Sequence, residues 1–236
     1  MSNITSTKNR KFHSALLISL LVIFFLVFNR RHILNVVDPQ PVIIHNSPNM
    51  IRAANPWNIA HADSCYSLLQ DGDLVLRAGS DAISDLFKRV NSRDKSYSHA
   101  GLIFYESGYP MVYNSIGTAE NPYAIVQRDS MKNFISPFDN TAYAIYRYKL
   151  NKREIGNLHD EMIKYYQEKR RFDPHFDLET DSLLYCTEIV YKGLEAATGQ
   201  KGYLSTTLAG KFEFVAVDDL FIKSDIKLVC KIVYKQ

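Results

Sequence analysis

Hydrophobic residues recur with helical spacing in the last third of the chain, around the stretch LLYCTEIV at residues 183–190. Apolar side chains occupy positions i, i+3 and i+4 from Cys186 to Ala197, which is the pattern of one buried helical face. An Asp-Ser pair just upstream supplies good N-cap residues, and Gly199 is a natural C-terminal stop. The pattern therefore predicts an amphipathic helix that begins at a cysteine.

Short apolar runs elsewhere predict strands separated by turns. Residues 99–105, HAGLIFY, form a buried strand, and a turn connects them to residues 111–116, so these two strands are expected to pair as a hairpin. Residues 68–76 are predicted to form an Asp-Gly turn followed by a strand. Further strands are predicted at 123–127, 142–148, 212–217 and 227–234, and helices at 80–90 and 152–170. This order of elements predicts an α+β domain with a mostly antiparallel sheet packed on helices.

The N-terminal segment is apolar all round. Residues 14–28 are fifteen uncharged residues between basic clusters, a length that is short for a spanning helix and at the upper limit for a signal-peptide core. Because no small-x-small cleavage motif follows, an uncleaved signal anchor is the first interpretation, a cleaved signal the second, and a buried helix the third. The predicted organisation is a cytoplasmic N-terminus over 1–11, a transmembrane signal anchor over 12–29, a tether over 30–63 and a domain over 64–236.

Composition excludes several functional classes. The 236-residue chain is 46% hydrophobic and 22% charged, and its net charge of +3 argues against nucleic acid as a partner. The ten glycines are scattered, so no phosphate-binding loop is present, and no serine lies in a GxSxG motif. Because nearly all of the mass follows one N-terminal anchor, we expect a single-pass membrane protein with its domain outside the cytoplasm.

A cysteine in the first turn of a helix has two interpretations. An unpaired cysteine is usually a small hydrophobic residue of the core. A helix N-terminus, however, favours negative charge, so it can lower the pKa of the Cys186 thiol and stabilise a nucleophilic thiolate. The helix start alone does not decide between them, because a nucleophile also requires a base.

His99 is the candidate base. None of the seven histidines follows Cys186 in the chain, so a base for this thiol has to come from an earlier segment. His99 opens an apolar strand in YSHAGLIF, where an imidazole would be held rigidly. Without Cys186, a core histidine bonded to a backbone carbonyl would be the better interpretation of His99.

Two other histidines offer weaker alternatives. His159 lies in a charged helical stretch and is interpreted as a solvated side chain. His175 lies in FDPHFD, where Asp173 and Asp177 flank it and could join it in a metal site. That cluster lacks an i, i+4 pair of helical ligands and any cysteine partner, so a metal site is disfavoured.

Cys65 competes with Cys186 as a nucleophile, because His159 and His175 lie downstream of it. An Asp-Gly turn interrupts the segment after Cys65, so no helix is expected to activate its thiol. Outside the cytoplasm, Cys65 could instead pair with Cys230 near the other end of the domain, which would leave Cys186 free. Connectivity cannot be read from the sequence, so both possibilities stay open.

Three stretches together, LQDGDLVL, YSHAGLIF and FDPHFDLETDSLLYCTEIV, resemble the circularly permuted papain-like amidases. These are the YaeF/YiiX-like branch of the NlpC-type cysteine hydrolase superfamily, in which a strand-leading histidine precedes the catalytic cysteine. The resemblance covers about residues 68–195. It implies a permuted papain-like α+β fold with Cys186 and His99 as the catalytic pair.

The resemblance also implies a third polar residue that orients the histidine, one hairpin strand later. Members of this branch often carry a glutamate there, whereas this chain has Asn114 at the matching position. An amide oxygen can accept the imidazole N–H, although it stabilises an imidazolium less than a carboxylate does. Tyr113 and Ser115 face the opposite side of the strand, so only one of these two sets can face His99.

The expected function is that of a membrane-anchored cysteine hydrolase that needs no metal ion or organic cofactor. Two substrate classes are open: a cell-envelope peptide amide, or an acyl ester or amide of a lipid. The alternative is a catalytically silent, membrane-tethered domain that binds a lipid or a peptide on the same fold.

Overall fold

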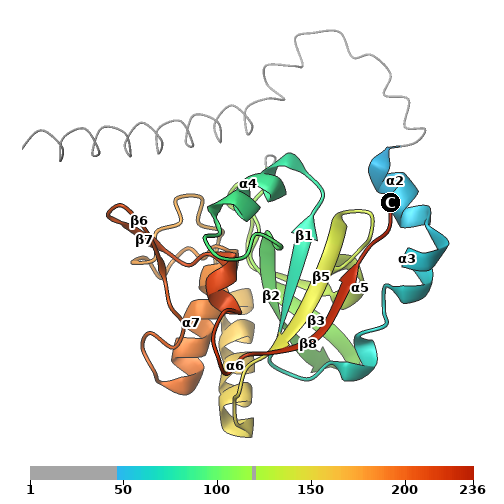
Figure 1. Cartoon of the computed structure of the whole chain (residues 1–236). Helices are drawn as coiled ribbons and strands as arrows, with labels where there is room; N and C mark the ends of the chain where they lie inside the picture. Colours follow the sequence, from blue (N-terminus) through green and yellow to red (C-terminus); the bar gives the residue numbers. More distant parts are fainter. Residues whose placement is uncertain (1–46, 119–120) are drawn as a thin grey trace, which may run out of the picture.

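A six-stranded sheet forms the centre of the protein in a computed structural model that describes residues 47–118 and 121–236 (Figure 1). The strand order is β4-β3-β2-β1-β5-β8, and every neighbouring pair is antiparallel. The strands are β1 (Asp73–Gly79), β2 (His99–Glu106), β3 (Tyr109–Asn114), β4 (Gln127–Ser130), β5 (Asn140–Arg147) and β8 (Lys227–Val233). The predicted α+β class with a mostly antiparallel sheet is confirmed.

Helices and one small hairpin surround the sheet (Figure 1). The α-helices are α2 (Pro48–Ala54), α3 (Pro56–His61), α4 (Ala82–Val90), α5 (Met131–Phe134), α6 (Lys152–Gln167) and α7 (Cys186–Thr198). Two 3-10 helices, η1 (Tyr66–Leu68) and η2 (Val217–Leu220), and a hairpin of β6 (Thr207–Ala209) and β7 (Phe212–Phe214) complete the described elements. Helix α7 begins at Cys186, as the hydrophobic pattern predicts.

Alternation along the strands divides the core into two layers. Side chains such as Leu76 and Leu102 point to one face, where they pack against α6 and α7. The intervening residues, such as Val75 and Ile103, point to the other face, where α5 lies. Gly193 on α7 permits the close packing of the two long helices, because a Cβ there would come within 2.6 Å of a Met162 side-chain carbon.

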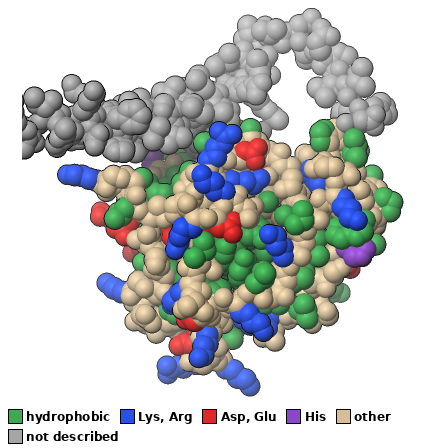
Figure 2. Space-filling view, viewed as in Figure 1, with side chains coloured by type: hydrophobic (Ala, Val, Ile, Leu, Met, Phe, Trp, Pro, Cys, Tyr) green, Lys and Arg blue, Asp and Glu red, His purple; other side chains and the backbone are tan. Residues whose placement is uncertain are grey.

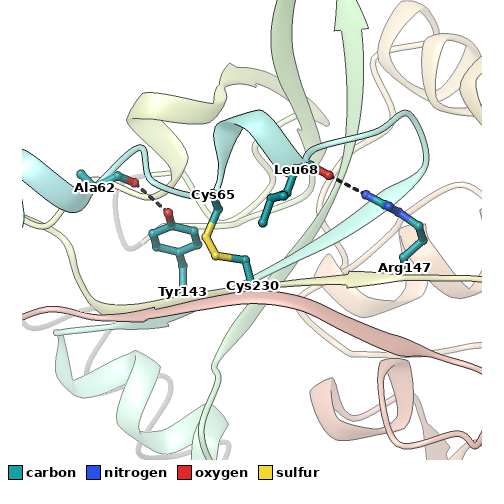
Figure 3. Close-up of a disulfide and its surroundings, with 6 residues drawn as sticks. All are labelled: Ala62, Cys65, Leu68, Tyr143, Arg147 and Cys230. Atoms are coloured by element: carbon teal, nitrogen blue, oxygen red, sulfur yellow. Dashed lines mark hydrogen bonds between the residues drawn. A yellow bond between two sulfur atoms is a disulfide. The ribbon is translucent and has the colours of Figure 1, made fainter.

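Cys65 and Cys230 form a disulfide, the pairing that the sequence left open (Figure 3). It joins the segment before η1 to strand β8, with the two Cα atoms 5.9 Å apart. The Tyr143 hydroxyl donates to the Ala62 carbonyl oxygen at 2.8 Å beside the disulfide. The disulfide removes Cys65 as a candidate nucleophile and leaves Cys186 as the free cysteine.

Part of the segment that the sequence predicts as a tether is helical. Residues 48–54 form α2 and residues 56–61 form α3, and these helices bond to the domain. Buried Arg52 donates from Nε to the Pro137 carbonyl oxygen at 2.6 Å and from Nη2 to the Phe138 carbonyl oxygen at 2.8 Å. Asn58 exchanges hydrogen bonds with the backbone of Lys235 at 2.7 and 2.8 Å. Pattern analysis missed this docking because both helices are short and their contacts lie far away in sequence.

The predicted signal anchor over 12–29 lies outside the described residues. Among the helices of residues 47–118 and 121–236, none has the length and apolar character to cross a membrane.

The strand predicted at 123–127 is displaced in the structure. Strand β4 occupies Gln127–Ser130, and Ile125 makes only an isolated bridge with Arg171. Figure 2 shows hydrophobic side chains gathered at the centre of one face of the molecule, with Lys and Arg side chains around them.

Candidate functional site

His99 is held at the start of β2 by a contact with the neighbouring strand. Its side chain is buried, and its Nε2 lies 3.2 Å from Oδ1 of Asn114 at the end of β3. Residue Gly101 makes room for this approach, because a Cβ there would lie 3.3 Å from the Asn114 Cβ and 2.5 Å from a Val112 methyl. The hairpin register thus brings together two of the three residues that the sequence singles out.

Asp129 determines how the Asn114 amide is oriented. Asn114 Nδ2 donates to Asp129 Oδ2 at 2.9 Å, and an ionised carboxylate can only accept. The amide oxygen must therefore face His99, which makes Nε2–H the donor of that hydrogen bond and leaves Nδ1 with a free lone pair. Sequence reasoning missed Asp129, because its register on β4 depends on a strand pairing that the pattern misplaced.

Cys186 lies beside the start of β2, within the influence of the backbone N–H of Ala100, the residue after His99. Burial raises the pKa of the Cys186 thiol to about 11, although the backbone N–H groups of Ala100, Thr187 and Cys186 and the charge of Arg77 act to lower it. The helix N-terminus therefore does not outweigh burial, and the resting thiol is protonated at neutral pH.

His99 is also uncharged in the resting protein. Burial holds the pKa of His99 well below its usual value of 6.5, and the positive charge of Arg77 lowers it further. The hydrogen bond to Asn114 acts in the opposite direction but is the smaller effect. The site therefore contains a neutral thiol and a neutral imidazole, and the neutral imidazole is the form that can accept a proton.

The rate at which iodoacetamide alkylates Cys186 is expected to be low at neutral pH and to rise until the pH approaches about 11. The reason is that only the thiolate reacts and burial raises the pKa of this thiol. Mass spectrometry of the Cys186 peptide measures the rate across pH, and the disulfide keeps the other two cysteines from reacting. A rate that already reaches its plateau below neutral pH would instead show a thiolate–imidazolium pair.

Several hydrogen bonds fix the helix start that carries the thiol. The Tyr185 backbone N–H donates to the Glu188 carboxylate at 3.1 Å, and the Tyr185 hydroxyl accepts the Val215 N–H at 2.9 Å. Thr187 Oγ1 donates to the Val215 carbonyl oxygen at 2.6 Å. Ser115 Oγ donates to the Leu184 carbonyl oxygen at 2.6 Å, so Ser115 braces this segment and does not face His99.

An apolar cavity of about 430 Å³ opens beside Cys186, which forms part of its wall. The remaining walls come from α4, the loop between α4 and β2, the loop before α7, the β6–β7 hairpin and the start of η2. The apolar side chains among them come from Leu86, Phe87, Val90, Pro174, Phe176, Phe212, Phe214, Val215 and Val217. The sequence does not predict this cavity, because its walls come from segments that are distant in the chain.

The other histidines have different surroundings. His159 is not simply solvated as predicted: its ring stacks on Phe104 with centroids 4.3 Å apart, and Nε2 lies 3.2 Å from Glu106 Oε1. His175 lies at the cavity wall. Both carboxylate oxygens of buried Asp173 accept backbone N–H groups, those of His175 at 2.8 Å and Asp177 at 2.7 Å, so Asp173 braces the loop.

Comparison with solved structures identifies the fold. The chain is similar to a crystal structure described as metalloprotein YiiX from Escherichia coli O157:H7, with a TM-score of 0.57 and 17% sequence identity. The match covers 70% of this chain and 98% of the YiiX chain. No family profile matches the sequence, and no curated protein is similar to it in sequence. The domain therefore has a YiiX-like fold, in agreement with the branch that the sequence motifs resemble.

Proposed function

We propose that this protein is a cysteine acyl hydrolase of the permuted papain-like type, with Cys186 as nucleophile, His99 as base and Asn114 as the residue that orients the base. The observation that carries the proposal is the apolar cavity, because its wall includes the free thiol. The YiiX-like fold and the hydrogen bond between His99 and Asn114 support it.

The reaction begins when His99 Nδ1 takes the proton of the Cys186 thiol as the sulfur attacks the substrate carbonyl carbon. The backbone N–H of Cys186 at the N-terminus of α7 stabilises the resulting oxyanion. His99 then gives the proton to the leaving group as the bond between carbonyl carbon and leaving group breaks. Water hydrolyses the thioester and restores the thiol. Asn114 keeps the imidazole in the tautomer that this sequence of steps requires.

The cavity favours a lipid acyl group over a cell-envelope peptide. Its lining is almost entirely aliphatic and aromatic, whereas a peptide would need partners for its backbone N–H and C=O groups. An acyl chain needs no such partners, and each buried CH₂ contributes about 0.8 kcal/mol. Its volume of about 430 Å³ lies in the range of ligand-binding pockets.

A location outside the cytoplasm, anchored by residues 12–29, is part of the proposal. The disulfide between Cys65 and Cys230 supports it, because such bonds persist in oxidising compartments and are rare in the cytosol. A lipid substrate is consistent with this location, since the predicted anchor would hold the domain next to a bilayer.

A metal ion does not fit the described residues, although the YiiX structure is described as a metalloprotein. No group of three or more His, Cys, Asp or Glu side chains within 47–118 and 121–236 is arranged to hold a metal. The carboxylate of Asp173, the best candidate in sequence, is occupied by backbone N–H groups. We therefore assign no step of the reaction to a metal ion.

One observation favours a second candidate function, a catalytically silent domain that binds an acyl lipid. The buried Cys186 thiol, with its pKa raised to about 11, is less nucleophilic at neutral pH than a free thiol. The two functions are distinguished by incubation with an envelope lipid extract. Mass spectrometry would detect an acyl adduct on Cys186 only if the protein is an enzyme.

Hydrolysis of acyl esters is expected to depend strongly on chain length. Each added CH₂ that enters the cavity should raise kcat/KM by about fourfold at most, until the cavity is full. The variant Val90→Trp should shorten the preferred chain, because Val90 lies in the cavity wall and is partly exposed. The control Leu208→Trp changes an exposed residue outside the wall and should leave the preference unchanged. A chain-length-independent rate together with turnover of cell-wall peptides would contradict the lipid assignment.

A further inference from the structure

A charged side chain, that of Arg77, lies next to the candidate dyad of Cys186 and His99. Arg77 on β1 is the direct antiparallel partner of His99 on β2, so both side chains point to the same face of the sheet. The Arg77 guanidinium carbon lies 4.9 Å from the centre of the Phe134 ring, and the His99 ring centre lies 5.5 Å from the same point. Arg77 and His99 therefore share one aromatic neighbour.

The hydrogen bonds of Arg77 are incomplete. Its Nη1 donates to Asn140 Oδ1 at 3.2 Å, whereas its Nε is buried and has no hydrogen-bond partner among the described residues. No carboxylate of those residues lies within 4.0 Å of its nitrogens. A buried guanidinium donor without a partner is costly, and its fork geometry suits the two oxygens of a carboxylate or phosphate.

Arg77 and the apolar cavity lie on opposite faces of the sheet. The cavity is walled by α4, α7 and η2, on the sheet face where Leu76 and Leu102 point. Arg77 contacts Phe134, which belongs to the core on the other face. An acyl chain in the cavity would place its carbonyl carbon at Cys186, and the leaving group would extend away from the cavity.

We propose that Arg77 binds an anionic group, a carboxylate or a phosphate, on the leaving-group side of the substrate. This inference rests on the proposed function, in which the acyl chain occupies the cavity. It defines the substrate as an acyl lipid with an acidic head rather than a neutral one. The effect of the Arg77 charge on both members of the dyad, whose pKa values it lowers, agrees with its nearness to them.

A purely structural role would give Arg77 a different behaviour. The contact with Phe134 and the bond to Asn140 brace the segment after α5, and loss of this brace would reduce stability without any preference for charge. The experiment therefore compares an anionic with a neutral ligand of nearly the same shape, because only anion binding makes the two differ.

The first measurement is the ratio of the rates at which iodoacetate and iodoacetamide alkylate Cys186 in the full chain. A positive Arg77 beside the thiol should raise this ratio about tenfold or more above that of a free cysteine thiol, as for a hydrogen bond to a charged group. Arg77→Met should return the ratio to the free-thiol value. Arg153→Met, on the exposed start of α6, makes the same change in net charge and should leave it unchanged.

A wild-type ratio no higher than that of the free thiol would overturn the proposal without any variant. Arg77→Lys addresses the possibility that Arg77→Met does not fold, and it should give an intermediate ratio because it keeps the charge but not the fork. A ratio in Arg77→Lys equal to wild type would show that the positive charge alone, without the guanidinium fork, produces the preference for the anion.

The second measurement is binding to the full-length Cys186→Ser variant, which does not require an active thiol. Dodecanoylglycine is compared with dodecanoylglycinamide, and dodecanoyl glycerol phosphate with dodecanoyl glycerol. The acidic member of at least one pair should bind about tenfold or more tightly, and the pair that responds tells carboxylate from phosphate. Equal affinities in both pairs would overturn the proposal. If the acidic ligands bind but Cys186 forms no acyl adduct in the wild type, the enzyme assignment fails and the Arg77 site stands.

Discussion

Replacement of Cys186 by alanine is expected to abolish hydrolysis of acyl esters, a loss of at least about 10³-fold in kcat. In the proposed mechanism the acyl group becomes attached to the sulfur of this thiol, and no other free cysteine is present in the described residues. His99→Ala should cause a loss of similar size, because both residues act in one proton transfer and their effects do not add. Turnover by the purified full chain measures both variants.

Two further variants change residues that position His99 and do not themselves react with the substrate. Asn114→Ala should reduce the rate about 10- to 1,000-fold while the fold is kept, as expected when a base loses the partner that orients it. Asp129→Asn should have a smaller effect in the same direction, because it no longer determines which end of the Asn114 amide faces His99. Unchanged rates in Cys186→Ala and His99→Ala, with folded proteins, would contradict the site assignment.

Loss of the disulfide between Cys65 and Cys230 is expected to cause the largest change in stability. The bond joins two cysteines that are 165 residues apart in the chain. Removing a disulfide that closes so long a loop lowers the free energy of unfolding of the protein by about 4–5 kcal/mol. The double variant Cys65→Ser/Cys230→Ser should therefore unfold at a much lower denaturant concentration. Trp57, the single tryptophan, lies on α3 and reports the transition by fluorescence.

The matched control for that experiment is the wild-type protein in reducing agent. It should reproduce the unfolding midpoint of the double variant, and the reductant should not shift the midpoint of the double variant itself. Alkylation of Cys186 should keep its pH dependence in both, because the disulfide and the thiol lie in different parts of the domain. Identical midpoints for the wild-type protein with and without reductant would contradict the predicted contribution of the disulfide to stability.

Local patterns in the sequence were sufficient to predict the helix and the strand that carry the proposed dyad. The helix that begins at Cys186 ends just before Gly199, as the periodicity and the stop signal predict. The strand β2 begins at His99, as the apolar run predicts. The hairpin that brings Asn114 near His99 is also a local structure, since only a short turn separates its strands. Hydrophobic spacing, caps and turns act over a few residues, which is why they can be read from the sequence alone.

Only the tertiary structure decided what surrounds the dyad. The cavity, the partner of Asn114 on β4, the position of Arg77 opposite His99 and the disulfide all join segments that are far apart in the chain. The protonation of the thiol also depends on them: a helix start favours the thiolate, but burial under residues from other elements raises the pKa of Cys186 more than the helix lowers it. The sequence by itself determined which groups are candidates for the reaction, and the packing of distant segments decided their charge and the cavity beside them.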